Sequence, residues 1–271
     1  MSLFISALNS GSNGNCYYVG NENEAVLIDQ GISCKELEKR MLRAGLSMKK
    51  VRAIFVSHEH SDHIRGVTAT SRKYEIPVHI TGQTLVSSGM GIDEGLTRTF
   101  SAYKPVHVGP ISVTAFPKFH DASDPHSFVV EQNGIRIGVF TDIGAPCDHV
   151  IRNFKGCHAA FLEANYDEEM LSNGTYPAYL KKRIRSDKGH LSNKQALDLF
   201  LNHRPDYMNC LLLSHLSRDN NSPELVAKLF AKHADATKIV VCSRYEETAV
   251  YRIGISTGGQ EEKKPQLRLF R

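Results

Sequence analysis

The sequence lacks tryptophan, carries little cysteine and contains no long apolar run. The six cysteines are scattered without a Cys-x-x-Cys pair, which argues against a disulfide framework and against a thiolate zinc cluster. No window approaches the roughly 18 to 20 apolar residues of a membrane span, and residues 1–8 lack the basic region of a signal peptide. We therefore expect a cytoplasmic protein that does not bind membranes.

An excess of charge of one sign is also missing. The 33 Lys and Arg residues and the 29 Asp and Glu residues leave a formal net charge of +4, which permits an anionic substrate without requiring one. Without tryptophan, stacking on nucleic-acid bases would fall to tyrosines such as Tyr166, Tyr176 and Tyr179. The 271 residues suffice for a two-sheet core without disulfides, so we expect one domain over residues 1–271.

What the sequence does have is a histidine-rich stretch at residues 57–63, Ser-His-Glu-His-Ser-Asp-His. The apolar run before it predicts a buried strand, so that His58 follows a strand end. In an extended turn His58 and His60 point to the same side, and Asp62 and His63 follow where the chain turns into a helix. The segment can therefore begin two neighbouring metal sites. The alternative is a histidine-rich surface loop with no ligand role.

The pattern His58-x-His60-x-Asp62-His63 resembles the signature of the metallo-β-lactamase superfamily of hydrolases. The resemblance implies an α/β fold, an αββα four-layer sandwich of two mixed β-sheets flanked by helices. Strands precede helices in both halves of the chain, which agrees with two similar units packed sheet to sheet. The resemblance also implies that Asp29 is a structural residue that supports the site rather than a ligand.

Other patterns predict individual elements. Apolar residues recur at helical spacing over residues 34–45, 64–74 and 177–184, and Asn133-Gly134 between two apolar runs predicts a β-hairpin. Residues 266–270 alternate as a strand would. The Gly-rich stretch that follows the first strand predicts a tight turn rather than a phosphate-binding loop, because no Gly-Lys-Ser/Thr follows it.

Three later strand ends supply further donors. The strand predicted over residues 111–116 runs toward His120, which we favour as a third imidazole, with His126 as the alternative. The strand after the predicted hairpin runs into Asp142, whose carboxylate can reach two metals; the alternative is a turn-forming aspartate. A last strand delivers His215, which fits the final metal position of the superfamily.

These donors give each of two metals three protein ligands, with one carboxylate between them: His58, His60 and His120 for one, Asp62, His63 and His215 for the other, and Asp142 as the bridge. Imidazole and carboxylate donors without thiolate suit Zn²⁺, Mn²⁺ or Fe²⁺ and do not choose among them. Two such ions would hold a bridging hydroxide as the nucleophile. The centre keeps about one net positive charge, which favours an anionic substrate such as a phosphodiester.

The stretch Gly-His190-Leu-Ser, the stretch Ser-His215-Leu-Ser-Arg-Asp-Asn-Asn and the Gly-rich turn resemble the bacterial YycJ-like (WalJ-like) subgroup. This likeness runs over residues 3–252 and implies an exonuclease that acts on DNA. Catalytic roles then fall to Asp62 and to His190, which would stabilise the transition state and protonate the leaving oxygen. The alternative is that His190 only supports the site through a hydrogen bond to a carboxylate such as Glu163.

Substrate binding is assigned to a basic run and to one asparagine: Lys181, Lys182, Arg183, Arg185 and Asn220. With Lys188, the run places five cations within eight residues just before His190, which predicts contacts with backbone phosphates. The alternative is a solvated helix face.

Other classes of function would use the same ligands. A thioesterase or lactonase of the glyoxalase II or β-lactamase kind gives no reason for the block around His190, and a metal-binding protein without catalysis would not need the complete ligand set. A small cyclic phosphodiesterase and an RNA substrate stay as alternatives to DNA. Oxidoreductases of this fold commonly carry Glu where His60 stands, so the resemblance favours hydrolysis.

Overall fold

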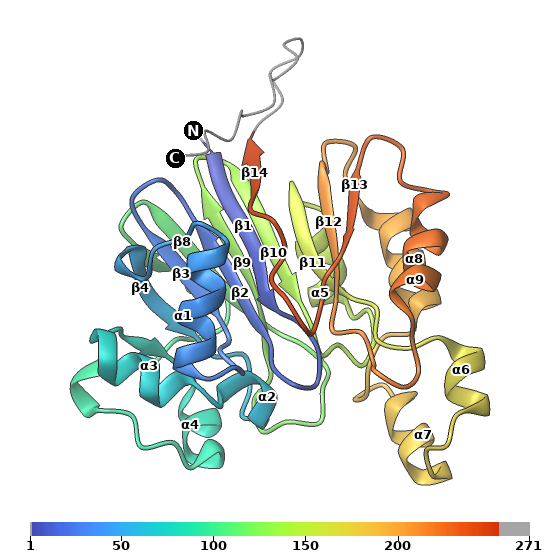
Figure 1. Cartoon of the computed structure of the whole chain (residues 1–271), viewed down its shortest axis with the longest axis horizontal. Coiled ribbons are helices and arrows are strands. Elements are labelled where there is room, and N and C mark those ends of the chain that lie inside the picture. Colours follow the sequence, from blue (N-terminus) through green and yellow to red (C-terminus); the bar gives the residue numbers. More distant parts are fainter. Residues whose placement is uncertain (1, 255–271) are drawn as a thin grey trace, which may run out of the picture.

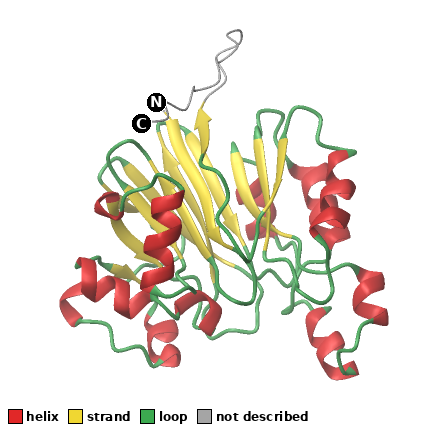
Figure 2. Ribbon diagram, in the orientation of Figure 1, coloured by secondary structure: helices red, strands yellow, loops and turns green. Residues whose placement is uncertain are grey.

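The computed structural model describes residues 2–254, which form two seven-stranded sheets packed face to face with helices on the outer sides (Figure 1, Figure 2). This is the four-layer αββα arrangement that the sequence predicts. The strand predicted over residues 266–270 lies outside the described residues.

Each sheet runs from a strand late in the chain to a short strand at the opposite edge. From edge to edge, the first sheet contains β14 (Tyr251–Gly254), β1 (Ser2–Asn9), β2 (Cys16–Gly20), β3 (Ala25–Ile28), β4 (Val51–Phe55), β5 (Val78–His79) and β6 (Thr97–Arg98). The second sheet contains β13 (Lys238–Val241), β12 (Cys210–Ser214), β11 (Ala159–Glu163), β10 (Ile135–Phe140), β9 (His126–Gln132), β8 (Ile111–Pro117) and β7 (Val106–Val108). The helices, in chain order, are α1 (Cys34–Arg43), α2 (Ser61–Ile64), α3 (Val67–Tyr74), α4 (Gly82–Ser88), α5 (Asp148–Phe154), α6 (Glu168–Asn173), α7 (Ala178–Ile184), α8 (Asn193–His203) and α9 (Pro223–Ala231), with 3₁₀ turns η1 (Met48–Lys50) and η2 (Glu94–Leu96). Within residues 2–254, none of these helices has the length and apolar character that crossing a membrane requires.

Each sheet changes from antiparallel to parallel pairing partway across. In the first sheet β1, β2 and β3 pair antiparallel, whereas β3, β4, β5 and β6 pair parallel. In the second sheet β8, β9 and β10 pair antiparallel, whereas β10, β11, β12 and β13 pair parallel. The carboxyl ends of parallel strands meet at one edge of a sheet, and the loops at that edge are where α/β folds bind ligands.

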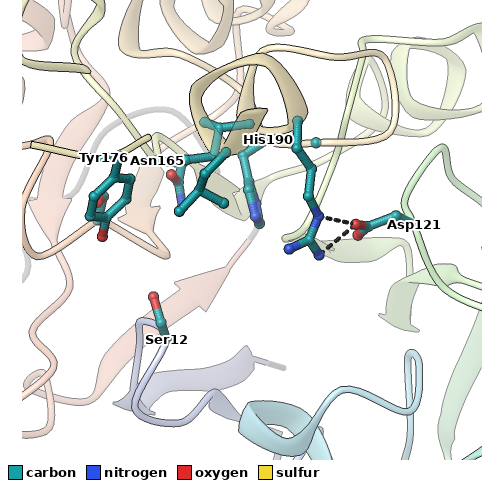
Figure 3. Close-up of a pocket in the computed structure, with 10 residues that line it drawn as sticks. Ser12, Asp121, Asn165, Tyr176 and His190 are labelled. Atoms are coloured by element: carbon teal, nitrogen blue, oxygen red, sulfur yellow. Dashed lines mark hydrogen bonds and ion pairs between the residues drawn. The ribbon is translucent and has the colours of Figure 1, made fainter. Parts of the chain in front are cut away.

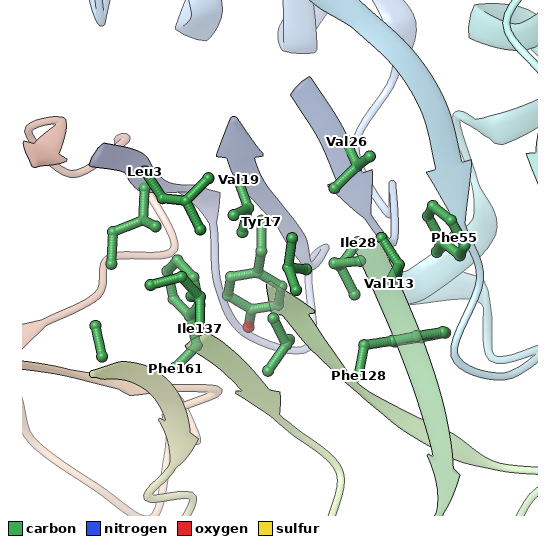
Figure 4. Close-up of a cluster of buried hydrophobic side chains, with 14 of the residues drawn as sticks. Leu3, Tyr17, Val19, Val26, Ile28, Phe55, Val113, Phe128, Ile137 and Phe161 are labelled. Atoms are coloured by element: carbon green, nitrogen blue, oxygen red, sulfur yellow. The ribbon is translucent and has the colours of Figure 1, made fainter. Parts of the chain in front are cut away.

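The core between the two sheets is apolar and rich in aromatic rings. Tyr17 of β2 and Phe161 of β11 have ring centroids 4.9 Å apart, and Phe55 of β4 lies 5.8 Å from Phe128 of β9 (Figure 4). All four side chains are buried. Burial of apolar surface stabilises a fold by about 25 cal/mol per Å², so this layer fixes how the strand ends of the two sheets face each other.

The predicted hairpin is present between β9 and β10. Asn133 and Gly134 both have positive φ, 50° and 79°, and Ile135 pairs with Gln132 directly across the turn. Two residues of positive φ match the right-handed twist of the flanking strands, which explains why Asn-Gly is favoured at this turn.

Two of the predicted helices have the expected places, and the third is divided. The helices predicted over residues 34–45 and 177–184 are α1 and α7. The helix predicted over residues 64–74 is interrupted near its start: a separate helix, α2, ends at Ile64, and α3 begins at Val67. Gly66 lies at the break, where an added Cβ would be 1.9 Å from the carbonyl oxygen of Ile32. Only glycine allows the backbone to approach so closely.

Candidate metal centre

Polar side chains gather where the parallel strands of both sheets end. The segment after β4 supplies four of them: His58 and His60 from a loop, and Asp62 and His63 from the helix α2 that follows it. The second sheet supplies one residue at the end of each of four strands: His120, Asp142, Glu163 and His215. All of these side chains except His60 and Asp62 are buried. Buried imidazoles and carboxylates need one another, or a metal, as partners.

The donor atoms of these residues form overlapping groups within 4.8 Å. Among the described residues, three groups contain only predicted ligands: His58, His60 and His120; Asp62, His63 and His215; and His58, His63 and Asp142. The first two are the triads expected from the sequence. Asp142 lies between them, with Oδ2 3.0 Å from His63 Nε2 and Oδ1 3.8 Å from His120 Nε2. The fold therefore brings all the predicted ligands together.

His126, the alternative third imidazole, lies elsewhere. It begins β9, where its backbone N–H donates to the Ser57 carbonyl at 3.0 Å and its Nδ1 donates to the Asp124 carbonyl at 2.9 Å. By contrast, His120 Nε2 lies 3.4 Å from His60 Nδ1. His120 lies in the loop after β8, whereas His126 is held in β9 opposite Pro117.

The donor atoms fit divalent metal ions. In the part of the chain that the structure describes, Asp142 Oδ2 and His215 Nε2 are buried without a well-aligned hydrogen bond. Their ion-pair contacts are with other predicted ligands: Asp142 Oδ2 lies 3.0 Å from His63 Nε2, and His215 Nε2 lies 3.5 Å from Asp62 Oδ2. Buried polar atoms with incomplete hydrogen bonding are costly, and both atoms belong to the groups that a metal would join. Because the donors are only imidazoles and carboxylates, the set suits Zn²⁺, Mn²⁺ or Fe²⁺.

Asp29 holds the loop after β4 in place. Its Oδ1 accepts from the Ser57 N–H at 2.7 Å, and its Oδ2 accepts from Ser57 Oγ at 2.8 Å and from His63 Nδ1 at 2.7 Å. This leaves Nε2 of His63 to face Asp142. A carboxylate on the far nitrogen fixes the ring and makes the near nitrogen a better metal donor. Asp29 thus makes the supporting contact that the resemblance implies.

Burial and neighbouring charge set the protonation of the imidazoles. Burial lowers the pKa of His58 well below its usual range and the pKa of His120 to about 3, so both rings are neutral. Burial acts in the same direction on His215, but Asp142 and other carboxylates outweigh it and raise the pKa of His215 well above its usual range. Burial alone would raise the pKa of Asp142, but His215 and His63 outweigh it and hold that pKa well below its usual range. A metal cation would take the place of these imidazolium protons.

Three residues at the strand ends have left-handed backbone, namely Asp29 (φ 59°), Asp142 (φ 53°) and His215 (φ 56°). This conformation is uncommon for residues other than glycine and costs on the order of 1 to 3 kcal/mol each. The packed strands before these residues offset the cost. The sharp turn at each strand end brings the side chain into the centre.

His190 lies beside the predicted ligands. Its Nδ1 donates to Glu163 Oε1 at 2.7 Å, and the same oxygen is 2.9 Å from His215 Nδ1. Glu163 Oε2 accepts from the Ile143 N–H at 2.7 Å. Because Nδ1 of His190 is engaged, its Nε2 is the nitrogen available to a substrate, and Figure 3 shows the ring pointing into a cavity.

Two residues of the centre are not predicted from the sequence. The sequence gives Glu163 only as a possible partner of His190, although Glu163 ends a buried strand and Asp142 closely follows one, which is a usable signal. Burial acts to raise the pKa of Glu163, but His190 and His215 outweigh it and lower that pKa to about 2. Lys118 is also buried, and its Nζ donates to the Thr141 carbonyl at 2.7 Å. No local pattern distinguishes it from an exposed lysine at a strand end.

A cavity of about 200 Å³ opens beside His190, between α7 and the Gly-rich turn. Figure 3 shows Ser12 and Tyr176 on its walls and, at its rim, an ion pair to Asp121. The partner in that pair is Arg183, whose Nε and Nη2 each lie 2.5 Å from Asp121 Oδ2. A substrate in this cavity would therefore meet both His190 and a guanidinium.

Other members of the basic run also have partners. Arg185 Nε lies 2.6 Å from Glu168 Oε1, and Lys181 Nζ donates to a backbone carbonyl at 2.8 Å. Lys182 and Lys188 are exposed. The run is therefore only partly available to phosphate groups.

Burial bears on two predicted substrate contacts. Asn220 is 1% exposed and Tyr166 is 3% exposed. The Asn220 carbonyl accepts from the Asp167 N–H at 2.8 Å, and its own N–H donates to Ser217 Oγ at 3.2 Å. Asn220 therefore supports the loop after β12, and its burial argues against the predicted contact with a substrate. Tyr166 is likewise not exposed to stack on a base, whereas Tyr179 is 75% exposed.

Comparison with known proteins gives a family and curated relatives. A family model described as a beta-lactamase superfamily domain matches residues 24–211. The protein called Exodeoxyribonuclease YycJ of Bacillus anthracis is 36% identical over 236 residues, which are 83% of this chain and 86% of the relative. Exodeoxyribonuclease WalJ of Streptococcus pneumoniae is 32% identical over 225 residues, which are 81% of this chain and 84% of the relative.

Solved structures show the same architecture. The metallo-beta-lactamase fold protein YhfI from Bacillus subtilis matches with a TM-score of 0.69 and 14% identity, over 93% of this chain and 100% of its own. Zn²⁺-bound PqqB from Methylobacterium extorquens matches with a TM-score of 0.67 and 14% identity, over 90% of this chain and 99% of its own. At such identities the likeness shows the fold alone, which is the fold predicted from the sequence.

Proposed function

We propose that this chain, which belongs to the β-lactamase superfamily and is a metal-dependent hydrolase, is an exonuclease that hydrolyses the phosphodiester bonds of DNA. The observation that carries the proposal is the position of His190, held by Glu163 at the edge of the donor groups and in the wall of a cavity. A proton donor beside a cationic centre suits a reaction in which a basic oxygen leaves an anionic phosphate. Two relatives called exodeoxyribonuclease support DNA as the substrate. A cytoplasmic location would accord with that substrate.

Two divalent ions, Zn²⁺ or Mn²⁺ with Fe²⁺ as a further option, would be held by the two triads and the carboxylate between them: His58, His60, His120, Asp62, His63, His215 and Asp142. When bound, such ions supply a water of lowered pKa and positive charge for the phosphate. The chain itself contributes the rigid placement of these donors, because each follows a strand fixed by the core.

The remaining groups act on the substrate directly. His190 would give a proton from Nε2 to the leaving oxygen while Glu163 holds its Nδ1. Asp62, whose side chain is partly exposed, would accept a hydrogen bond from the attacking water. Arg183 would exchange its bond to Asp121 for one to the substrate phosphate.

The test is a panel of substrates for purified protein loaded with Mn²⁺ or Zn²⁺. We expect release of mononucleotides from linear DNA, hydrolysis of bis(p-nitrophenyl) phosphate, and no cutting of closed circular DNA, which has no ends. Asp142→Ala protein purified in the same way controls for a contaminating nuclease. Hydrolysis of a thioester or lactone with no attack on either phosphodiester would reject the proposal in favour of the other hydrolase class.

A further inference from the structure

A second cavity, of about 300 Å³, lies on the other side of the loop that carries His215. We propose that it binds the nucleotide next to the scissile phosphate of a DNA strand, with the base against an apolar wall and a phosphate at two arginines. The proposal rests on the function proposed above. We call this cavity the arginine pocket; its walls include Leu216, Arg218, Pro223, Val241, Arg244 and Tyr245.

The arginine pocket is joined to the candidate metal centre through shared residues. Ser217, two residues after His215, lines both this pocket and the cavity beside His190. Ser10 also lines the pocket; its Oγ accepts from the His215 N–H at 2.8 Å, and its own N–H donates to the Ser243 carbonyl at 3.1 Å. Figure 1 shows the loop between β13 and β14 passing beside the turn after β1. A DNA strand that leaves the first cavity past Ser217 would therefore enter the arginine pocket next.

The lining of the pocket carries two arginines, and the carboxylate that contacts one of them, Asp219, is not part of that lining. The described lining includes Arg218 and Arg244 and no acidic side chain. The Arg218 side chain is 74% exposed, and its ion pair with Asp219 is long, with 3.9 Å between Nε and Oδ1. Within residues 2–254, Arg244 Nη1 is buried and has no hydrogen-bond partner. A buried guanidinium N–H without an acceptor is costly, and because the Arg244 side chain as a whole is partly exposed, it can turn toward the pocket and satisfy this N–H with a phosphate oxygen.

Apolar side chains form one wall of the pocket, and the elements that carry them are fixed in place. Leu216 is buried, Val241 ends β13, and Pro223 begins α9. Tyr245 stands at the rim with 76% exposure, and Arg40 Nη2 donates to its carbonyl at 2.9 Å. An exposed aromatic ring on an anchored backbone is a platform on which a base can stack, and such stacking accepts every base. We therefore expect little sequence preference from this pocket.

Arg244→Ala tests the phosphate contact. Arg52→Ala is the matched control, because Arg52 is exposed near the start of β4, away from the strand end that leads to the centre. Rates are compared on a single-stranded oligonucleotide and on bis(p-nitrophenyl) phosphate, which is too small to occupy both cavities. We expect Arg244→Ala to reduce kcat/KM on the oligonucleotide on the order of tenfold more than on the small diester, and Arg244→Lys to recover part of the loss. Equal losses on both substrates would overturn the proposal.

Equilibrium binding gives a readout that does not depend on turnover. Fluorescence anisotropy with a labelled oligonucleotide should show a salt dependence of log affinity that is shallower by about 0.7 in Arg244→Ala than in Arg52→Ala, the value for one lost phosphate contact on a single strand. An unchanged slope would overturn the phosphate contact.

An abasic nucleotide placed in turn at the positions nearest the end tests the base contact. At one position it should weaken binding to the unaltered protein on the order of tenfold, and it should have no such effect on Tyr245→Ala. If Tyr245→Ala discriminates as strongly as the unaltered protein, the base binds elsewhere and the pocket assignment fails. Failure of the unaltered protein to degrade DNA would instead reject the proposed function.

Discussion

The first sheet places four donor side chains in one short segment after β4, a loop followed by α2, whereas the second sheet supplies one residue from the end of each of four strands. The supporting carboxylates differ in the same way. Asp29 fixes His63 within the first sheet, but Glu163 joins His215 to His190, which come from separate parts of the second half. The first set is therefore a local property of the chain. The second set depends on the register of a whole sheet.

The largest expected effect comes from removing the donor that both sets share. Because Asp142 lies between the two triads, Asp142→Ala should bring bound metal from about two ions per chain toward none and hydrolysis to background. His60→Ala removes a donor from one triad only and should leave about one ion. Elemental analysis of the purified variants measures this, with Asp198→Ala on the exposed face of α8 as the control. Full occupancy in both variants would contradict the ligand assignment.

The next largest effect concerns His190, and it separates the catalytic rate from metal binding. His190→Ala should retain its metal and lose about 10² to 10⁴ in rate, because a general acid is removed. The loss in rate should be smaller on a diester whose leaving group is nitrophenolate, because this group leaves without a proton. His233→Ala, an exposed histidine after α9, is the control. Lost metal, or equal losses on good and poor leaving groups, would mean that His190 only supports the site.

A smaller effect compares the two supporting carboxylates directly. Asp29→Asn and Glu163→Gln should each weaken metal binding by about 10- to 100-fold, because each removes the charge behind a ligand imidazole. At saturating metal only Glu163→Gln should stay slow, since Glu163 also orients His190. Competition with a chelating dye gives the affinities. Full recovery of Glu163→Gln at high metal would show that the two carboxylates have the same role.

The smallest effect concerns the basic run. Lys182→Ala and Lys188→Ala should each make the dependence of log DNA affinity on log salt shallower by about 0.7 to 0.9, because both side chains are exposed. Arg185→Ala should change it less, since Arg185 is paired with Glu168. Salt slopes that are the same in all three variants would favour a solvated helix face.

Much of the first half could be predicted because its signals are local. The apolar run before His58 and the order of donors after it predict a strand, a turn and two neighbouring metal sites, and the structure gathers those donors. The hairpin at Asn133 is equally local, because two residues of positive φ are enough to define it. The four-layer fold followed from the resemblance, and family and structural comparisons confirm it.

The rest depends on distances that no short pattern contains. The loop between β8 and β9 places His120 at the centre, whereas pairing in β9 holds His126 away from it. The packing of β11 between β10 and β12 puts Glu163 against His215. Only the structure shows that Asn220 is buried and that Arg183 forms an ion pair with Asp121. The sequence by itself determined which side chains can bind metal and which strands carry them. Only the tertiary structure decided which of them meet, because a one-residue change in register turns every side chain of a strand to the opposite face.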